Sequence, residues 1–356
     1  MDALKLLSDY RKRLHPYLEC FFNEKLEQAK EINAISEEAV AMIRDFTMAG
    51  GKRIRPAVMY YGYLAAGGTE REKMIKTSMS IELAHNFLLI HDDIIDNDEL
   101  RHGIKTIHEQ YKEMAQKMFP KTDPVHFGNS MAIVTGDMTA SMSNEIMFTA
   151  DFPAEYIVKA LNKLQQVVYA TIPGEMVDVM LEARGRATEE EIMNMYEAKT
   201  ACYTFEGPLH LGAILAKAND GILKKFTDYS IPLGIAFQIR DDSLGIFGQQ
   251  EKLGKPVGSD IIEGKQTILI VKALEMGDKE QRKTILRLLG KEDISESEIE
   301  IFRNIIRETG SLDYAYDLSD KLVNRSLEAF SVMDIQHKES KIFLEGIARF
   351  IIERQY

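Results

Sequence analysis

The spacing of apolar residues is the feature that most restricts what this chain can fold into. Leucine, isoleucine and aromatic residues recur three and four positions apart over nearly the whole sequence. This is the period of a helix with one buried face, and the alternating runs typical of strands are few. The pattern predicts an all-α fold. Examples stand near both ends: Leu4, Leu7, Leu14, Phe343, Ile347 and Ile351.

Size and charge narrow the class of protein. The 356 residues contain no low-complexity linker, so we expect one all-helical domain over residues 1–356. Lysine and arginine number 44 against 56 acidic residues, a net charge of −12, which disfavours nucleic acid as a partner. Two cysteines exclude a disulfide framework, and no stretch of about 18 apolar residues is present. We expect a cytoplasmic protein without an integral membrane segment.

Two apolar helical windows each end in an acidic pair, from Ile81 to Asp93 and from Tyr229 to Asp242. In the first, Asp92 and Asp96 are four residues apart and share a helix face. Like charges so placed repel unless a cation lies between them, and carboxylate oxygens suit Mg²⁺. A solvated acidic helix end is the alternative interpretation.

The second acidic pair is Asp241-Asp242. Adjacent residues cannot both face one way on a helix, so we expect only Asp241 to be a metal ligand. Gly245 would mark a helix end or a close approach. By itself the pair could be a simple helix boundary.

Basic residues occur in separated sets. Lys52 and Arg55 lie three apart at the start of an expected helix, which favours anion binding, although a surface charge cluster is the alternative. Two acidic pairs and several separated cations indicate two phosphorylated groups, one held through metal and the other by salt bridges. The remaining cations of interest are Arg101, Lys199, Lys255 and Lys265.

In this order and spacing, the motifs resemble those of trans-isoprenyl diphosphate synthases, the polyprenyl synthetase family. The resemblance covers most of the chain. The matching elements are GGKRIRP (50–56), HDDIIDNDELRHG (91–103), Gly136-Asp137, Lys199-Thr200, FQIRDDSLG (237–245), Lys255 and Lys265.

The resemblance implies long helices around a deep central cavity, usually in a homodimer. It also implies condensation of isopentenyl diphosphate with an allylic diphosphate, using three Mg²⁺ ions held by Asp92, Asp96 and Asp241. The allylic diphosphate would contact Arg101, Lys199, Lys255 and Lys265. Isopentenyl diphosphate would contact Lys52, Arg55 and His85. Thr200 and Gln238 would lie beside the developing cation.

Three positions depart from the family pattern. His102 stands where a second arginine is usual, which bears on isopentenyl diphosphate binding because histidine is only partly charged near neutral pH. Gly245 replaces the last aspartate of the second motif. Glu175 replaces a more usual glutamine.

The length of the product should depend on the side chains below Asp92. Phe87 lies five positions earlier, about 7.5 Å down the helix, where its ring could close the cavity floor, while Ala84 leaves room. This resembles synthases of geranylgeranyl (C20) type. The alternatives are an ordinary core role for Phe87, a farnesyl or a C25-or-longer product, and a non-catalytic regulatory subunit. Two other classes of protein are disfavoured, because a terpene cyclase needs only one diphosphate site and a helical scaffold protein needs neither acidic pair.

Overall fold

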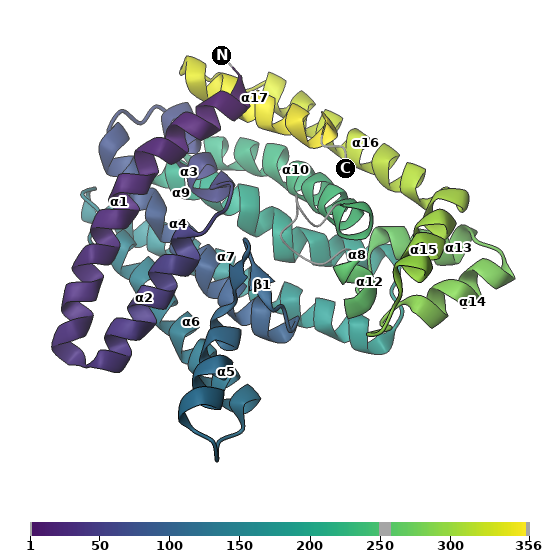
Figure 1. Cartoon of the computed structure of the whole chain (residues 1–356). Helices are drawn as coiled ribbons and strands as arrows, with labels where there is room; N and C mark the ends of the chain where they lie inside the picture. The colour runs from purple at the N-terminus through teal and green to yellow at the C-terminus, as the bar shows by residue number, and fades with distance from the viewer. Residues whose placement is uncertain (1, 249–257, 354–356) are drawn as a thin grey trace.

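Helices make up nearly all of the structure, as the apolar spacing predicts (Figure 1). This computed structural model describes residues 2–248 and 258–353. The helices up to residue 148 are α1 (Ala3–Ile32), α2 (Ala34–Met48), α3 (Ile54–Ala65), α4 (Arg71–Ile95), α5 (Ile107–Met118) and α6 (Pro124–Phe148). Then come α7 (Ala154–Arg184), α8 (Glu189–Tyr196), the π-helix η1 (Glu197–Glu206), α9 (Gly207–Leu215) and α10 (Asp220–Phe247). The last are α12 (Ser259–Glu263), α13 (Ile268–Met276), α14 (Lys279–Leu288), α15 (Glu296–Glu308), α16 (Ser311–Ser331) and α17 (Lys338–Glu353).

A small antiparallel hairpin follows α4. Its strands are β1 (Leu100–Arg101) and β2 (Ile104–Lys105), and Leu100 pairs with Lys105. Strands of two residues cannot stand alone, and this hairpin packs beside the cavity described below. The fold class is therefore all-α, as expected.

One expected helix boundary is wrong. Helix α10 runs past the acidic pair at Asp241 and ends at Phe247, because Asp242 is satisfied by hydrogen bonds inside the molecule and does not stop the helix. Helix α7 begins after Pro153, its N-cap residue, and contains Pro173 in its interior.

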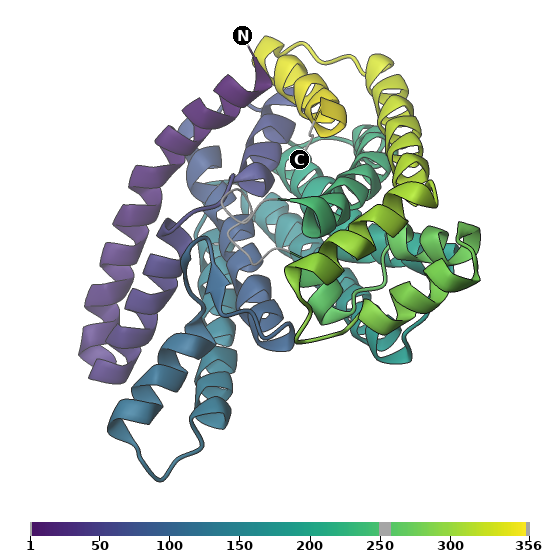
Figure 2. The same ribbon diagram turned by 45° about the vertical axis from the view of Figure 1, so that its right-hand side comes forward.

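Helix α10 joins the two larger hydrophobic clusters of the molecule. Its Leu233 and Ala236 pack in a cluster with α1, α3, α4 and α17, while Ile235 and Ile239 pack in a cluster with α8 and α13 to α16. Figures 1 and 2 show α1 along one side of the molecule and the pair α16 and α17 on another, with α10 between. The polar residues Gln238 and Asp241 of this helix line the cavity described below.

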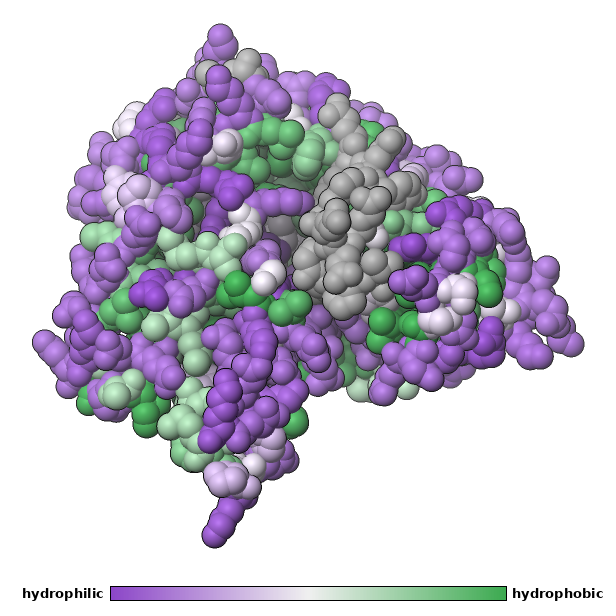
Figure 3. Space-filling model, in the orientation of Figure 1, coloured by the Kyte–Doolittle hydropathy of each residue, from purple (hydrophilic) through white to green (hydrophobic). Residues whose placement is uncertain are grey.

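Within the described ranges, none of the helices is both long and apolar enough to cross a bilayer. The face shown in Figure 3 is dominated by hydrophilic residues, with smaller apolar areas between them.

Candidate active site

A cavity of about 630 Å³ lies between α4 and α10 and is also lined by residues of the loop before α3, the β1–β2 hairpin, η1 and the segment from α12 onward. It brings together most of the residues that the sequence singles out. Those that line it are Lys52, Arg55, His85, Asp92, Asp96, Arg101, His102, Lys199, Gln238, Asp241 and Lys265.

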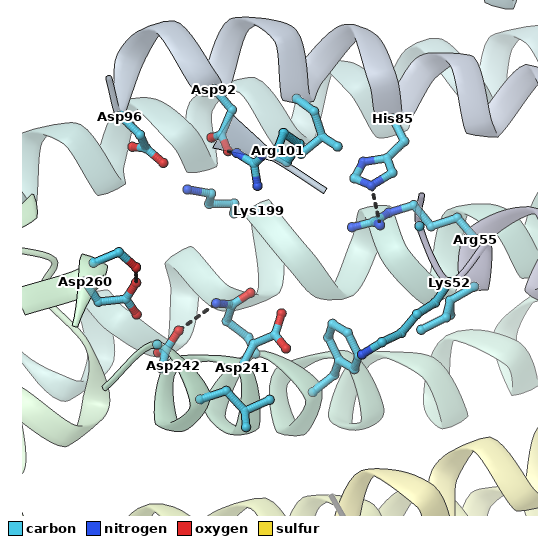
Figure 4. A pocket seen from close by; sticks show the side chains of 18 of the residues that line it. Lys52, Arg55, His85, Asp92, Asp96, Arg101, Lys199, Asp241, Asp242 and Asp260 are labelled. Carbon is cyan, nitrogen blue, oxygen red and sulfur yellow. Dashed lines mark hydrogen bonds and ion pairs between the residues drawn. The ribbon is translucent and has the colours of Figure 1, made fainter. Parts of the chain in front are cut away.

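Carboxylates face one another across one end of this cavity. Asp92 lies in the last turn of α4 and Asp96 is the C-cap residue that follows it, while Asp241 lies on the opposite wall, on α10 (Figure 4). Asp96 is paired with Lys265 at 2.9 Å. A set of hard oxygen donors on facing walls fits Mg²⁺, which accepts one or two carboxylates and completes its shell with phosphate oxygens and water.

Asp242 has a different role from Asp241. Its carboxyl group accepts hydrogen bonds from the Tyr196 hydroxyl and from Gln238 Nε2, the latter at 2.7 Å. Gln238 Oε1 accepts a hydrogen bond from Thr200 at 2.7 Å. Burial raises the pKa of Asp242 well above its ordinary value. These bonds fix the orientation of the Gln238 amide.

Lys199 projects into the same end of the cavity from η1 (Figure 4). Its ammonium lies 2.6 Å from Asp178 and 2.6 Å from Glu175, both on α7. Burial lowers the pKa of Lys199, but Asp178, Asp92 and Glu175 outweigh it and raise the pKa, so the side chain is charged at neutral pH. A π-helix is rare and is often found at functional sites.

The other end of the cavity is basic. Arg55 Nη1 lies 3.0 Å from His85 Nε2, and Arg55 Nη2 donates to Thr204 at 2.9 Å. Because arginine only donates, His85 Nε2 accepts, and the neutral ring carries its proton on Nδ1. Burial and the neighbouring Arg55 lower the pKa of His85 well below its ordinary value. Arg55 Nε and His85 Nδ1 are buried and have no hydrogen-bond partner among the described residues. A ligand that supplied an acceptor to these donors would remove the cost of leaving them unpaired.

The loop that carries Lys52 is held in a strained conformation. Arg53, with φ of 55°, donates to Glu82 and to the backbone oxygen of Thr47. His102, with φ of 54°, packs against Gly50, where an added Cβ would lie 2.9 Å from its ring. Burial, Arg101 and Arg53 lower the pKa of His102, so its ring is neutral at neutral pH. Positive φ at residues other than glycine often marks functional sites.

The Arg101 side chain, predicted to bind a diphosphate, is held in place by carboxylates of its own chain. Its guanidinium donates to Asp93 at 2.7 Å and to Asp98 at 2.8 Å, and lies 3.7 Å from Asp92. Burial opposes its charge, but these carboxylates raise the pKa of Arg101 further. The guanidinium thus links the hairpin to the end of α4 beside the acidic wall.

The two residues expected to set product length lie elsewhere on α4. Phe87 and Ala84 are not among the described residues that line the cavity. The Phe87 ring packs edge to face on His91, with centroids 5.0 Å apart. Residues five apart on a helix are turned about 140° from one another, so Phe87 and Asp92 lie on different faces. A floor at Phe87 therefore requires an apolar extension of the cavity along that other face.

Some site residues were missed by sequence reasoning, and one predicted residue lies outside the described part of the chain. Asp178 and Tyr196 give no motif signal, because each acts through a partner distant in sequence. Arg53 lies inside GGKRIRP, but only its contact with Glu82 reveals its role. Lys255, expected to contact the allylic diphosphate, is outside the described residues.

An all-α fold with acidic helices facing one another and two sets of cations in one cavity is typical of enzymes that act on prenyl diphosphates. A family model described as polyprenyl synthetase matches residues 36–306. The chain belongs to the polyprenyl synthetase family, and it is a trans-prenyltransferase, as the motifs indicate.

Individual relatives lie within the same family. A geranylgeranyl diphosphate synthase of Saccharolobus solfataricus is 37% identical over 309 residues, covering 86% of this chain and 87% of that protein. A geranylfarnesyl diphosphate synthase of Natronomonas pharaonis is 31% identical over 324 residues, covering 86% and 87%. The crystal structure of geranylgeranyl pyrophosphate synthase from Corynebacterium glutamicum, complexed with isoprenyl diphosphate and magnesium, has a TM-score of 0.91 and 31% identity, with 100% of both chains covered.

Proposed function

We propose that this polyprenyl synthetase condenses isopentenyl diphosphate with an allylic diphosphate, and that its main product is geranylgeranyl diphosphate (C20). The observation that carries the proposal is the division of one cavity into two anion sites. Asp92 and Asp241 face each other beside Lys199 at one end, while Arg55 and His85 meet at the other (Figure 4). A protein that binds a single diphosphate does not need both ends. The names of the Saccharolobus solfataricus relative and of the solved structure agree with a C20 product.

The acidic end is assigned to the allylic diphosphate. Asp92, Asp96 and Asp241 would hold Mg²⁺, with three ions as the proposed number. When bound there, Mg²⁺ neutralises charge that develops on the departing pyrophosphate. Fixed ammonium and guanidinium groups in the cavity stabilise the same charge as the allylic C–O bond breaks. The basic residues assigned to this diphosphate are Arg101, Lys199, Lys255 and Lys265.

The basic end is assigned to isopentenyl diphosphate. Lys52, Arg55 and His85 hold its diphosphate, which aligns its double bond with the allylic carbon and makes the attack effectively intramolecular. Thr200 and Gln238 lie beside the carbon that becomes positive, and a carbonyl oxygen there favours the charge. The double bond of isopentenyl diphosphate is the nucleophile, and the released pyrophosphate takes the proton whose loss restores the alkene, so neither a side-chain nucleophile nor a side-chain base is needed.

Chain length is assigned to Phe87, with Ala84 one turn further down α4. A C25 product is the second candidate, because the Phe87 ring is turned onto His91 and because one relative is a geranylfarnesyl diphosphate synthase. If the ring stays turned aside, the chain can grow past it toward Ser80 and Met79.

A homodimer is proposed from the distribution of apolar surface. Of the 22 large apolar side chains that are exposed among the described residues, 11 lie on α6 and α7, including Phe148, Tyr169, Met176 and Met180. So much apolar surface on two neighbouring helices favours burial against a second copy. A cytoplasmic location is proposed from the composition and from the free thiols of Cys20 and Cys202.

The metal assignment is tested with Asp92→Asn and Asp241→Asn, which keep side-chain size and remove one charge. Each should lower turnover roughly 100-fold or more, because charge on the leaving group is no longer stabilised. The measurement is incorporation of labelled isopentenyl diphosphate at saturating Mg²⁺. Asp228→Asn is the matched control, since Asp228 is exposed on the same helix as Asp241. Near-normal turnover in either site variant would overturn the assignment.

A further inference from the structure

Lys199 has one more carboxylate partner than a neutral ion pair requires. Asp178 Oδ2 and Glu175 Oε2 each lie 2.6 Å from its Nζ atom. Both carboxylates come from α7 and are three residues apart, so they reach the same point in space. Asp178 lines the cavity together with Lys199.

The close packing of α7 against η1 explains why the side chain of residue 175 reaches the Lys199 ammonium. A Cβ at Gly174 would lie 2.7 Å from the backbone nitrogen of Lys199, so α7 and η1 are in direct contact at this point. A side chain as long as glutamate at the next position extends to the ammonium. Glutamine, the residue that the resemblance to the family gives for this position, has the same length and can also accept a hydrogen bond, but it carries no charge.

Glutamate instead of glutamine at position 175 therefore adds a negative charge beside Lys199 without changing the length of the side chain. Lys199 with Asp178 alone is neutral, and the addition of Glu175 leaves a net charge of −1. Burial raises the pKa of Glu175, Lys199 lowers it, and Asp92 across the cavity raises it, so these groups lie within one another's fields. An anionic ligand approaching Lys199 meets this extra negative charge.

We propose that Glu175 lowers the affinity of the acidic end of the cavity for diphosphate, by competing with the ligand for the Lys199 ammonium, and thereby favours release of pyrophosphate. The inference rests on the proposed function, because it takes Lys199 as a ligand of the allylic diphosphate. Glu175 acts through Lys199 and is a positioning residue, while Asp178 alone suffices to hold the lysine in place.

The test uses the full chain with the Glu175→Gln substitution and inorganic pyrophosphate as the probe. At fixed saturating Mg²⁺, calorimetry should show the dissociation constant for pyrophosphate falling roughly tenfold, the effect of one charge at a partly buried site. In steady-state assays the KM for the allylic diphosphate should fall similarly, whereas the KM for isopentenyl diphosphate should stay within about twofold. A general structural disturbance would not separate the two substrates in this way.

Two further variants complete the design. Glu197→Gln is the matched control, because Glu197 is an exposed glutamate on η1, two residues from Lys199, and it should leave pyrophosphate binding unchanged. Glu175→Ala removes both the charge and the acceptor, and it should also tighten binding. Melting temperatures of all variants report on folding.

Equal dissociation constants for the unsubstituted protein and Glu175→Gln would overturn the inference. So would weaker binding in both Glu175 variants, which would mean that Glu175 is needed to hold Lys199. Failure of the proposed function is distinguishable, because it would appear as absence of a condensation product from the unsubstituted protein, whereas the calorimetric comparison requires no turnover.

Discussion

At the scale of single residues, the cavity separates groups that face a ligand from groups that hold others in place. Asp241 faces the opposite wall, whereas its neighbour Asp242 is bound by Tyr196 and Gln238. Gly245 shows a similar constraint: a Cβ at this position would overlap the Asp260 carboxylate, so an aspartate there would require Asp260 to move. The close approach expected at Gly245 is therefore confirmed.

The role of Phe87 in chain length is a prediction at the same scale. Phe87→Ala should shift the product distribution toward chains at least one C5 unit longer, because removal of the ring opens space along its face of α4. The measurement is chromatography of the dephosphorylated products. Leu88→Ala is a control of similar volume change at the next position. An unchanged distribution for Phe87→Ala would place the floor at another residue.

At the scale of elements, the π-helix η1 is held by glycines on its neighbours. Gly174 of α7 touches the backbone of Lys199, and a Cβ at Gly234 of α10 would overlap Ala201. The wide π turn is thus accommodated because two adjacent helices lack side chains where it passes. This places Lys199 and Thr200 on the same element, where Lys199 pairs with Glu175 and Asp178 of α7 and Thr200 donates to Gln238 of α10.

Gly234→Ala tests this packing. The added methyl group must displace η1 from α10, which should lower the free energy of unfolding by about 2 kcal/mol and raise the KM for the allylic diphosphate. Gly221→Ala, the same substitution in the first turn of α10, should change stability by less than about 1 kcal/mol. Urea unfolding followed by circular dichroism measures both. Equal stability of the two variants would contradict a tight contact at Gly234.

Sequence reasoning could predict the helices but not how they meet. The apolar period identifies α4 and α10, and acid spacing selects Asp92, Asp96 and Asp241 as residues of one cavity. The π turn of η1 could not be predicted, because it depends on glycines in α7 and α10 that are distant in the chain. The pairing of Glu175 with Lys199 could not be predicted for the same reason. Only the 2.6 Å contact between the two side chains indicates what glutamate, instead of glutamine, could do at this position.

At the scale of the whole molecule, α10 ties two hydrophobic clusters together, which favours cooperative folding; a single domain over residues 1–356 stays a prediction. Several histidines of this structure are desolvated to different degrees: His108 and His210 are buried, His85 is partly buried and His102 is exposed. Burial lowers the pKa of His85, His102, His108 and His210. Such groups remain neutral in the folded state while they take up protons in the unfolded state.

The sign of the resulting pH dependence follows from linkage. Below the ordinary histidine pKa of 6.5, the unfolded state binds a proton that folded His85 excludes, so stability is lost as pH falls through this value. The loss from His85 should approach about 1.4 kcal/mol per pH unit. Urea unfolding between pH 7.5 and 5.5 should therefore give a shallower decline for His85→Asn than for the unsubstituted protein. Parallel curves would contradict a neutral, partly buried His85.

The central claim is that two diphosphates meet in one cavity and yield a C20 product. The most direct measurement is product analysis after incubation of the purified protein with Mg²⁺, labelled isopentenyl diphosphate and each of the C5, C10 and C15 allylic diphosphates. The account predicts a predominant C20 alcohol after dephosphorylation, from every starter. A predominant C15 or C25 alcohol would contradict the chain-length assignment, and absence of product with all three starters would contradict the claim itself.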